Sequence, residues 1–176
     1  MYKSIKILNS DFFNRDCLEI APALIGKILV RKLDNGNEIR IRITETEAYR
    51  GMEDKACHAS KGKTPRASIL WCESGTIYVY LCYGVHWLFN IVTGNIDEPQ
   101  AVLIRAGENA KGPGILTKKL GINKDFNEKN ITSCHNLWLE DDGYSPKIKT
   151  DKRVGIDYAG DEWVNKPWRF IDAEKG

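Results

Sequence analysis

The sequence of 176 residues lacks the patterns that mark metal fingers, membrane spans and secreted proteins. Its five cysteines are an odd number without a C-x-x-C pair, which favours reduced thiols. A zinc site assembled from Cys57, His58, Cys72 and Cys134 is the alternative, but scattered spacing disfavours it, so we expect neither metal nor other cofactor. No stretch approaches the ~20 apolar residues of a membrane span, and no signal-peptide core is present. We therefore expect a cytoplasmic protein that does not bind membranes.

A strong charge of one sign is also missing. The chain has 26 basic and 24 acidic residues and a net charge of +2, so no global field attracts nucleic acid. Local clusters such as 61–66, 118–119 and 147–153 would have to supply any such contact, although each alone is typical of a solvated surface. No G-x-G-x-x-G, Walker or G-x-S-x-G motif occurs, which argues against dinucleotide, nucleoside-triphosphate and serine-hydrolase chemistry.

The length and the even composition predict one compact domain over residues 1–176. A short helix is predicted after Asp16, although Pro22 makes its interior doubtful, and a second from Gly112-Pro113 to Gly121. Strands dominate, and most follow hairpin-like turns, so we expect a mixed α/β fold on a curved, mostly antiparallel sheet with peripheral helices. The predicted extended segments are 27–33, 38–47, 76–80, 85–93, 101–106, 138–140, 148–157 and 163–170.

The segment Glu45-Thr-Glu47-Ala-Tyr49 ends one predicted strand. Alternation places Glu45, Glu47 and Tyr49 on one face, with Thr46 and Ala48 on the other. An edge strand whose glutamates meet solvent is one interpretation. The other is a carboxylate that activates water beside an aromatic stacking platform.

Aromatic residues gather in a second segment, where Tyr78 and Tyr80 precede a Tyr83-Gly84 turn. Structural aromatics within a sheet would explain the strand residues. An exposed ring on a tight turn is poorly explained by packing, whereas a wedge that fills the gap left by an unstacked base requires that placement. His58 lies in a long basic loop over 49–74 and means little without its neighbours.

Taken together, these motifs resemble the alkyladenine (3-methyladenine or methylpurine) DNA glycosylases, and the likeness covers nearly the whole chain. Many separate motifs in one order make a chance match far less probable than a single pattern does. They are Glu45–Tyr49, His58, Thr64–Arg66, Gly75–Tyr80, Tyr83-Gly84, Asn90, Val102–Arg105, Gly112–Gly114, Gly121–Lys124, Arg153–Gly155 and Ala159–Phe170.

The resemblance implies an enzyme of base excision repair. Glu47 would be the general base that activates a water, and Arg105 and the main-chain carbonyl of Val154 would help to hold that water. No lysine replaces Glu47 as nucleophile, which implies base excision without strand cleavage. The implied fold is an open barrel like the C-terminal domain of formyltransferases. The implied partner is double-stranded DNA with damaged purines, bound by a monomer that is nucleoid-associated if bacterial.

The resemblance also implies roles for the residues that bind the flipped base. Its slot would lie between Tyr49 on one face and His58 with Tyr80 on the other, with Leu103 in the pocket. The backbone N–H of His58 would read the six-position of the purine, and Asn90 would exclude the exocyclic amine of guanine.

The DNA itself would be held by a separate set of residues. By resemblance Tyr83 would intercalate from the minor groove, and the DNA backbone would be contacted by Thr64, Arg66, Tyr78 and Gly84.

Three positions depart from the family pattern: Ala67-Ser68, Glu73 and Ile115. Each removes a donor or adds negative charge near the expected DNA face, which predicts weaker and more salt-sensitive binding. Two rival interpretations stay open. One is a catalytically idle nucleic-acid-binding module, and the other is a small-molecule hydrolase that uses the same Glu47 pocket.

Overall fold

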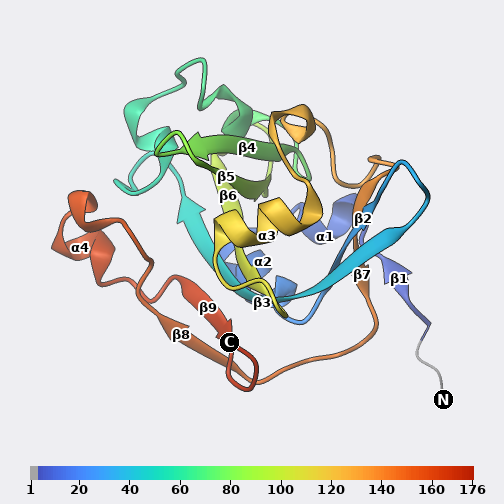
Figure 1. The fold of residues 1–176 in the computed structure, drawn as a ribbon. Coiled ribbons are helices and arrows are strands. Elements are labelled where there is room, and N and C mark those ends of the chain that lie inside the picture. Colours follow the sequence, from blue (N-terminus) through green and yellow to red (C-terminus); the bar gives the residue numbers. More distant parts are fainter. Residues whose placement is uncertain (1–3) are drawn as a thin grey trace.

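A computed structural model describes residues 4–176, whose strands form one curved sheet (Figure 1). The strand order is β1-β7-β2-β3-β6-β5-β4, and β9 pairs with β3 and β8. Every pairing among these strands is antiparallel, which confirms the predicted sheet type. The sheet is not closed, and its likeness to formyltransferases stays a prediction. The strands are β1 (Lys6–Ile7), β2 (Ile28–Lys32), β3 (Glu38–Arg50), β4 (Ile77–Cys82), β5 (His86–Val92), β6 (Gln100–Gly107), β7 (Leu137–Asp141), β8 (Ile148–Asp151) and β9 (Arg169–Asp172).

Strand β3 joins the two halves of this sheet. Its first residues pair with β2, and its second half lies between β6 and β9. Register shifts between Ile43 and Thr46 mark the point where β3 changes its pairing partners. Such irregularities bend a strand and increase its twist. The second half of β3 is therefore flanked by strands on both sides, so Glu45 and Glu47 do not lie on a solvent-facing edge.

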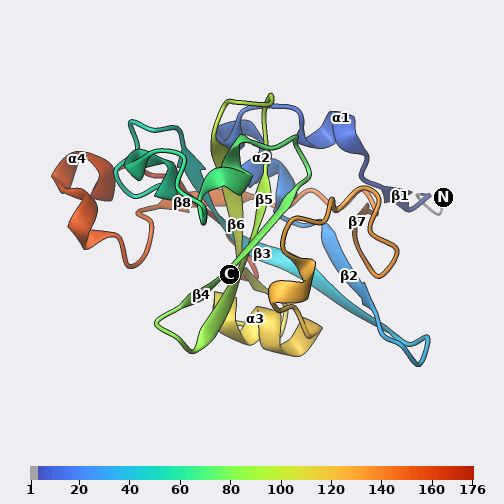
Figure 2. The ribbon, with the colours of Figure 1, turned by 90° about the horizontal axis from the view of Figure 1, so that it is seen from above.

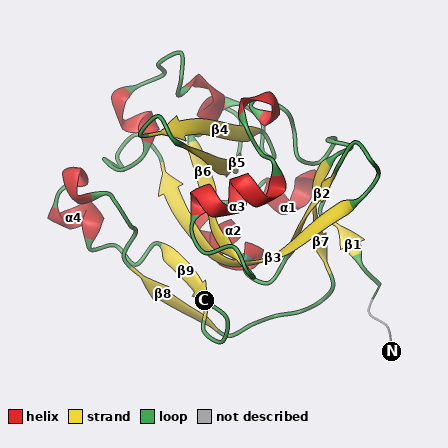
Figure 3. Ribbon diagram, viewed as in Figure 1, coloured by secondary structure: helices red, strands yellow, loops and turns green. Residues whose placement is uncertain are grey.

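The helices lie around the sheet rather than within it (Figure 3). The predicted caps are confirmed, because the Asp16 side chain accepts the Leu18 N–H at the start of α2, and Gly121 ends α3 in the left-handed conformation. Pro22 lies inside α2, so the helix forms although a proline in its interior was expected to disfavour it. The α-helices are α1 (Ser10–Phe13), α2 (Cys17–Leu24), α3 (Pro113–Leu120) and α4 (Asp161–Val164); the 3₁₀ helices are η1 (His58–Lys61), η2 (Ser68–Trp71), η3 (Lys124–Phe126) and η4 (Asp157–Ala159).

Three predictions of local structure are wrong in part. The segment 49–74 is not a plain loop, since it continues β3 and contains η1 and η2. The strand expected over 148–157 ends at Asp151, because the chain then turns so that the buried Arg153 can reach its partner Asp54. The extended segment expected over 163–170 begins instead within α4, and only its end belongs to β9.

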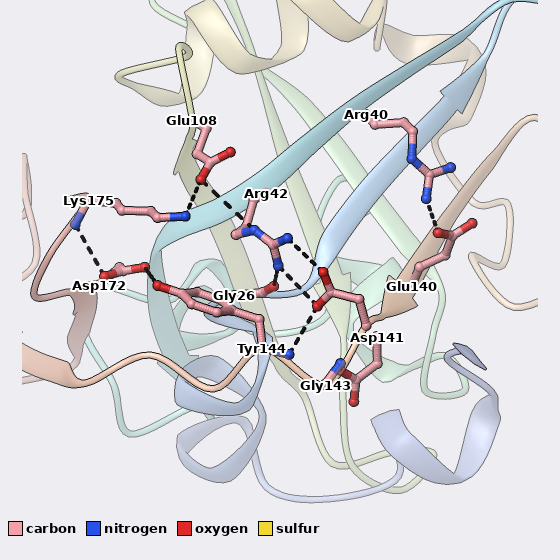
Figure 4. Close-up of polar contacts among 11 residues, drawn as sticks. Gly26, Arg40, Arg42, Glu108, Glu140, Asp141, Gly143, Tyr144, Asp172 and Lys175 are labelled. Atoms are coloured by element: carbon pink, nitrogen blue, oxygen red, sulfur yellow. Dashed lines mark hydrogen bonds and ion pairs between the residues drawn. The ribbon is translucent and has the colours of Figure 1, made fainter. Parts of the chain in front are cut away.

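Polar contacts tie the C-terminal residues to the sheet (Figure 4). Arg42 of β3 pairs with Asp142 at 2.7 Å between Nη2 and Oδ2, while Lys175 pairs with Glu108 at 2.6 Å. The Tyr144 ring lies under the guanidinium of Arg42, with 4.7 Å from Cζ to the ring centroid. These contacts join segments that follow β6, β7 and β9 to one side of β3.

The apolar core is formed by one face of the central strands and by helices α2 and α3. Thr46 of β3 donates its hydroxyl to the Ala21 carbonyl of α2, and Thr117 of α3 bonds the Trp87 carbonyl of β5. Viewed from above, the tip of the β4–β5 hairpin projects beside α3 (Figure 2). One face of β3 and β6 packs against α2, and the other face of these strands lines the candidate site.

Ile104 of β6 is fully buried in this core, whereas Ile96 is 63% exposed. We expect Ile104→Ala to lower the free energy of unfolding by about 2–5 kcal/mol, because the surrounding strands cannot move in to fill the cavity that it leaves. The matched truncation Ile96→Ala should cost less than about 0.5 kcal/mol. Urea unfolding followed by circular dichroism measures both values, and equal losses would contradict this description of the core.

Candidate active site

A cavity of about 710 Å³ opens on the face of the sheet that turns away from α2. Glu47 and Tyr49 line it from β3, while the alternate residues Thr46 and Ala48 face the core, as alternation predicts. The other walls come from β4, β5 and β6, from the segments 56–58 and 154–158, and from the beginning of α3. A volume of several hundred Å³ is typical of pockets that enclose a small organic molecule.

Glu47 is the most deeply buried charged group of this cavity, with no exposed surface. Its Oε1 accepts the Val154 N–H at 2.8 Å, and its Oε2 accepts the Tyr49 hydroxyl at 2.7 Å. Arg105 lies nearby, with 3.8 Å between its Nε and Oε1. Burial raises the pKa of Glu47 above its usual value, although the Tyr49 hydroxyl, Arg105 and the Val154 amide each oppose that rise. The result is a carboxylate that is more basic than a surface glutamate.

Glu45 organises the charges beside Glu47. Its Oε1 accepts Arg105 Nε at 3.2 Å and Arg169 Nη1 at 2.6 Å. Arg169 also pairs with Asp151 at 2.7 Å, which fixes the end of β8 against β9. Arg105 is therefore shared between two carboxylates and lies closer to Glu45 than to Glu47.

One wall of the cavity consists of closely packed aromatic rings that are tilted against one another. His58 and Tyr80 have centroids 4.7 Å apart at an interplanar angle of 58°, and His58 Nδ1 shares a hydrogen bond of 2.8 Å with the Tyr78 hydroxyl. Burial lowers the pKa of His58 to about 4, with Arg66 and Lys61 contributing in the same direction. His58 is therefore neutral at pH 7, and this wall presents rings without a positive charge on the imidazole.

Tyr49 lines the cavity from β3, and Asn90 and Leu103 line it from the neighbouring strands β5 and β6. Asn90 and Leu103 are direct partners in the register of these strands. The Asn90 side chain donates Nδ2 to the Tyr78 carbonyl at 3.1 Å, which fixes its orientation in the buried part of the cavity. The structure thus brings together all five residues predicted for the base pocket and both charged residues predicted for catalysis.

Tyr83 occupies the hairpin tip between β4 and β5, as predicted, and its side chain is 90% exposed. Tyr83 and Gly84 have φ values of 51° and 67°, and the Val85 N–H bonds the Cys82 carbonyl across them. Left-handed backbone at a tyrosine costs on the order of 1–2 kcal/mol. Packing does not explain an exposed ring that is held at such a cost beside the cavity.

The residues predicted to contact the DNA backbone differ in their exposure. Arg66 is exposed at the cavity, where its Cζ lies 4.9 Å from the Tyr80 ring centroid, and Thr64 accepts the Ala67 N–H. Tyr78, in contrast, is only 3% exposed and bonds His58, so it forms part of the cavity wall.

Among the departures from the family pattern, Ala67 is 2% exposed. The Ala67 side chain therefore packs inside the protein while Ser68 is partly exposed, and the predicted loss of a donor near the DNA face stays a prediction. Glu73 is exposed and accepts the Asn130 amide at 3.3 Å, and Ile115 lines the cavity with an exposed side chain.

Asp54, Arg153 and Arg169 were not assigned a role from the sequence. Asp54 and Arg153 form a bidentate ion pair at 2.6 and 2.9 Å, with both side chains fully buried behind Tyr49. No local spacing signals a pair whose members are 99 residues apart. Within residues 4–176 no three histidine, cysteine or acidic side chains gather as metal ligands would, and no helix there has the length and apolar character of a membrane span.

The Tyr49 hydroxyl donates to Glu47, so its removal should destabilise the charged carboxylate. We expect Tyr49→Phe to raise the pKa of Glu47 further above its value in the unchanged protein. Tyr158→Phe is the matched control, because its hydroxyl donates to the Ala56 carbonyl instead. Carbon-13 NMR titration of the glutamate carboxyls measures both, and an unchanged or lower pKa in Tyr49→Phe would contradict the described hydrogen bond.

Residues 11–111 and 108–176 match the methylpurine-DNA glycosylase (MPG) family. A protein of Natranaerobius thermophilus is 42% identical over 187 residues, which cover 93% of both chains. A protein of Methanocella arvoryzae is 41% identical, covering 94% of this chain and 92% of its own. Both are named "Putative 3-methyladenine DNA glycosylase". The chain thus belongs to the methylpurine-DNA glycosylase family.

Proposed function

We propose that this DNA glycosylase flips alkylated or deaminated purines out of duplex DNA and hydrolyses their N-glycosidic bond with a water activated by Glu47. The substrate class comprises 3-methyladenine, 7-methylguanine, hypoxanthine and ethenoadenine, and the product is an abasic site. One observation carries the proposal: a fully buried carboxylate lies in an aromatic-walled cavity beside an exposed tyrosine in a strained conformation.

Hydrolysis needs a base and a stabilised cationic sugar. Ionised Glu47 accepts a proton from water while the water oxygen bonds C1′, and the electrons of the broken C1′–N bond pass to the purine. The same carboxylate stabilises the positive charge that develops on the sugar. Arg105 and the carbonyl of Val154 would help to hold the water, and the Val154 N–H supports this arrangement by fixing Oε1 of Glu47.

The flipped base would lie between Tyr49 and the rings of His58 and Tyr80. Alkylation at N3 or N7 makes a purine cationic, and a cation between aromatic faces gains roughly 0.5–2 kcal/mol. A neutral His58 suits such a ligand, since a protonated imidazole would repel it. We assign the reading of the six-position to the backbone N–H of His58. We assign the exclusion of undamaged guanine to Asn90, whose fixed amide lies in the wall and would clash with the exocyclic amine. 7-Methylguanine carries the same amine, but its alkylation weakens the glycosidic bond and so favours excision.

On the DNA side, we propose that Tyr83 enters from the minor groove and fills the space left by the extruded nucleotide. Gly84, Arg66 and Thr64 would contact the backbone near this point. The buried position of Tyr78 supports a role in orienting His58 rather than the predicted phosphate contact.

We further propose that the enzyme is monofunctional and acts as a monomer. A lyase needs an amine that attacks C1′, and the place beside the sugar is taken here by Glu47. Lys111 is the sole lysine among the described residues that line the cavity, and it is exposed at the beginning of α3.

We expect Glu47→Gln to reduce the single-turnover rate of hypoxanthine or 7-methylguanine excision by roughly 10²–10⁴-fold, since the amide cannot accept the proton. Glu19→Gln, at an exposed position on α2, is the matched control and should retain the full rate. Abasic sites are counted after hot alkali, and an untreated sample should stay uncut if there is no lyase step. Undiminished excision by Glu47→Gln would refute Glu47 as the base, and a chain without any excision would favour the idle binding module.

Tyr83→Ser removes the proposed wedge, whose ring lies at the exposed rim of the cavity, and leaves Glu47 and the buried aromatic wall in place. Stacking by one aromatic ring contributes roughly 1–3 kcal/mol, so binding to a lesion duplex should weaken by about tenfold or more and excision should slow. Tyr83→Phe keeps the ring and should behave like the unchanged protein. Fluorescence anisotropy with a labelled duplex gives the affinities, and full activity of Tyr83→Ser would favour a small-molecule hydrolase.

A further inference from the structure

The proposed reaction leaves one costly feature unexplained, the ion pair between Asp54 and Arg153. Both side chains are fully buried, and the guanidinium also donates Nη1 to the Ala48 carbonyl at 2.9 Å. Asp54 in turn accepts the N–H groups of Arg50 and Ala56. Burying two charges costs several kcal/mol per ion before their attraction offsets it, so such a pair is weak as a device for stability alone.

The location of the pair relates it to the cavity. Arg153 Cζ lies 4.8 Å from the centroid of the Tyr49 ring and 5.0 Å from that of Trp168, so the guanidinium is held between two aromatic rings. Tyr49 lines the cavity and Arg153 does not. The Tyr49 ring therefore separates a buried cation from the space in which a base would stack.

The next residue connects the pair to Glu47 as well. Val154 directly follows Arg153, and its N–H is the donor to Oε1 of Glu47. By fixing Arg153, Asp54 thus positions one stacking ring and one donor of the carboxylate. If Asp54 had only a structural role, these two positioning effects would be its whole contribution.

Charge suggests a second role. A base stacked on the cavity side of Tyr49 would lie roughly 8 Å from the guanidinium, and at an effective dielectric near 20 an unneutralised cation there would weaken binding of a cationic base by roughly tenfold to thirtyfold. On the opposite wall, Arg66 lies against Tyr80 in a comparable way. Arg66 is exposed, so water screens its charge, whereas Arg153 is out of reach of water and needs a carboxylate.

We propose that Asp54 is a specificity-determining residue: by neutralising Arg153 behind Tyr49 it allows the cavity to accept purines that carry a positive charge. The inference rests on the proposed function and deepens it, because it names the residue that makes the pocket tolerant of cationic lesions.

The test compares two duplexes that differ in charge but hardly in shape. One contains 7-methyladenine on a 2′-fluoroarabino sugar, which resists cleavage, and the other contains neutral 7-methyl-7-deazaadenine on the same sugar, so neither base carries the amine that Asn90 would exclude. The ratio of the two Kd values, measured by fluorescence anisotropy, isolates the charge of the base. A loss of packing changes both Kd values together and leaves their ratio unmoved.

We expect Asp54→Asn to shift this ratio against the cationic duplex by roughly tenfold to thirtyfold, and Arg153→Gln to shift it in favour of the cationic duplex. The double variant Asp54→Asn with Arg153→Gln has no charge behind Tyr49 and should return to the ratio of the unchanged protein, whatever its absolute affinity. It is also the variant best able to fold, because removing both members of a buried pair costs less than removing one.

Circular dichroism establishes which variants are folded. A ratio that stays constant in the folded single variants would overturn the inference, as would an unchanged protein that binds the neutral duplex tenfold more tightly than the cationic one. The second outcome needs no variant to fold. If the unchanged protein binds neither duplex better than undamaged DNA and excises no lesion, the proposed function itself fails, which is a different result.

Discussion

The arrangement of the site depends on the complete burial of one ionisable carboxylate. Glu47 is supported from three parts of the chain: it accepts hydrogen bonds from Tyr49 on its own strand and from the amide of Val154 after β8, and the charge of Arg105 on β6 lies 3.8 Å away. Because these three groups come together only when the sheet and the C-terminal segment are both in place, the site requires the fold as a whole. Its raised pKa means that burial works against the charged form in the folded protein. Above that pKa the ionised group therefore lowers stability relative to the unfolded chain. Such a cost is characteristic of functional sites.

Strand β3 holds Glu47 in this buried position. Its alternate residues serve two purposes, because Thr46 and Ala48 pack towards α2 while Glu45, Glu47 and Tyr49 face the site. The flanking strands β6 and β9 satisfy its backbone on both sides. The carboxylate is thus attached to one of the most constrained segments of the molecule. A rigid support of this kind would keep the proposed base in position without a mobile loop.

Much of this arrangement could be predicted from local sequence. The alternation around Glu47 gave its face, the Gly112-Pro113 and Gly121 positions gave the ends of α3, and the Tyr83-Gly84 pair gave the hairpin tip. These features depend on residues close together in the chain, where spacing and backbone preference act directly.

Features that depend on distant partners could not be predicted in this way. The strand expected over 148–157 stops at Asp151 because Arg153 turns to meet Asp54, which lies 99 residues earlier. The pairing of Arg169 with Glu45 spans 124 residues. A surface-like run of basic and acidic residues has the same local appearance whether its members face water or each other. Only the assembled sheet decides between the two.

The charges of the site explain how Glu47 can be basic although an arginine lies beside it. A close pair with Arg105 would lower the pKa of Glu47 and weaken it as a base. Burial outweighs this effect, although Arg105 does lower the pKa of Glu47. Glu45 limits the effect by accepting Arg105 Nε at 3.2 Å, compared with 3.8 Å to Glu47, and it binds Arg169 as well. Arg105 stays near enough to orient a water or to stabilise charge, but its own charge is largely matched by Glu45. With the buried Arg153 matched by Asp54 and His58 neutral, the carboxylate of Glu47 is the charge best placed to act on a cationic sugar. Glu45 is therefore as much a part of the proposed chemistry as the residues that face the substrate.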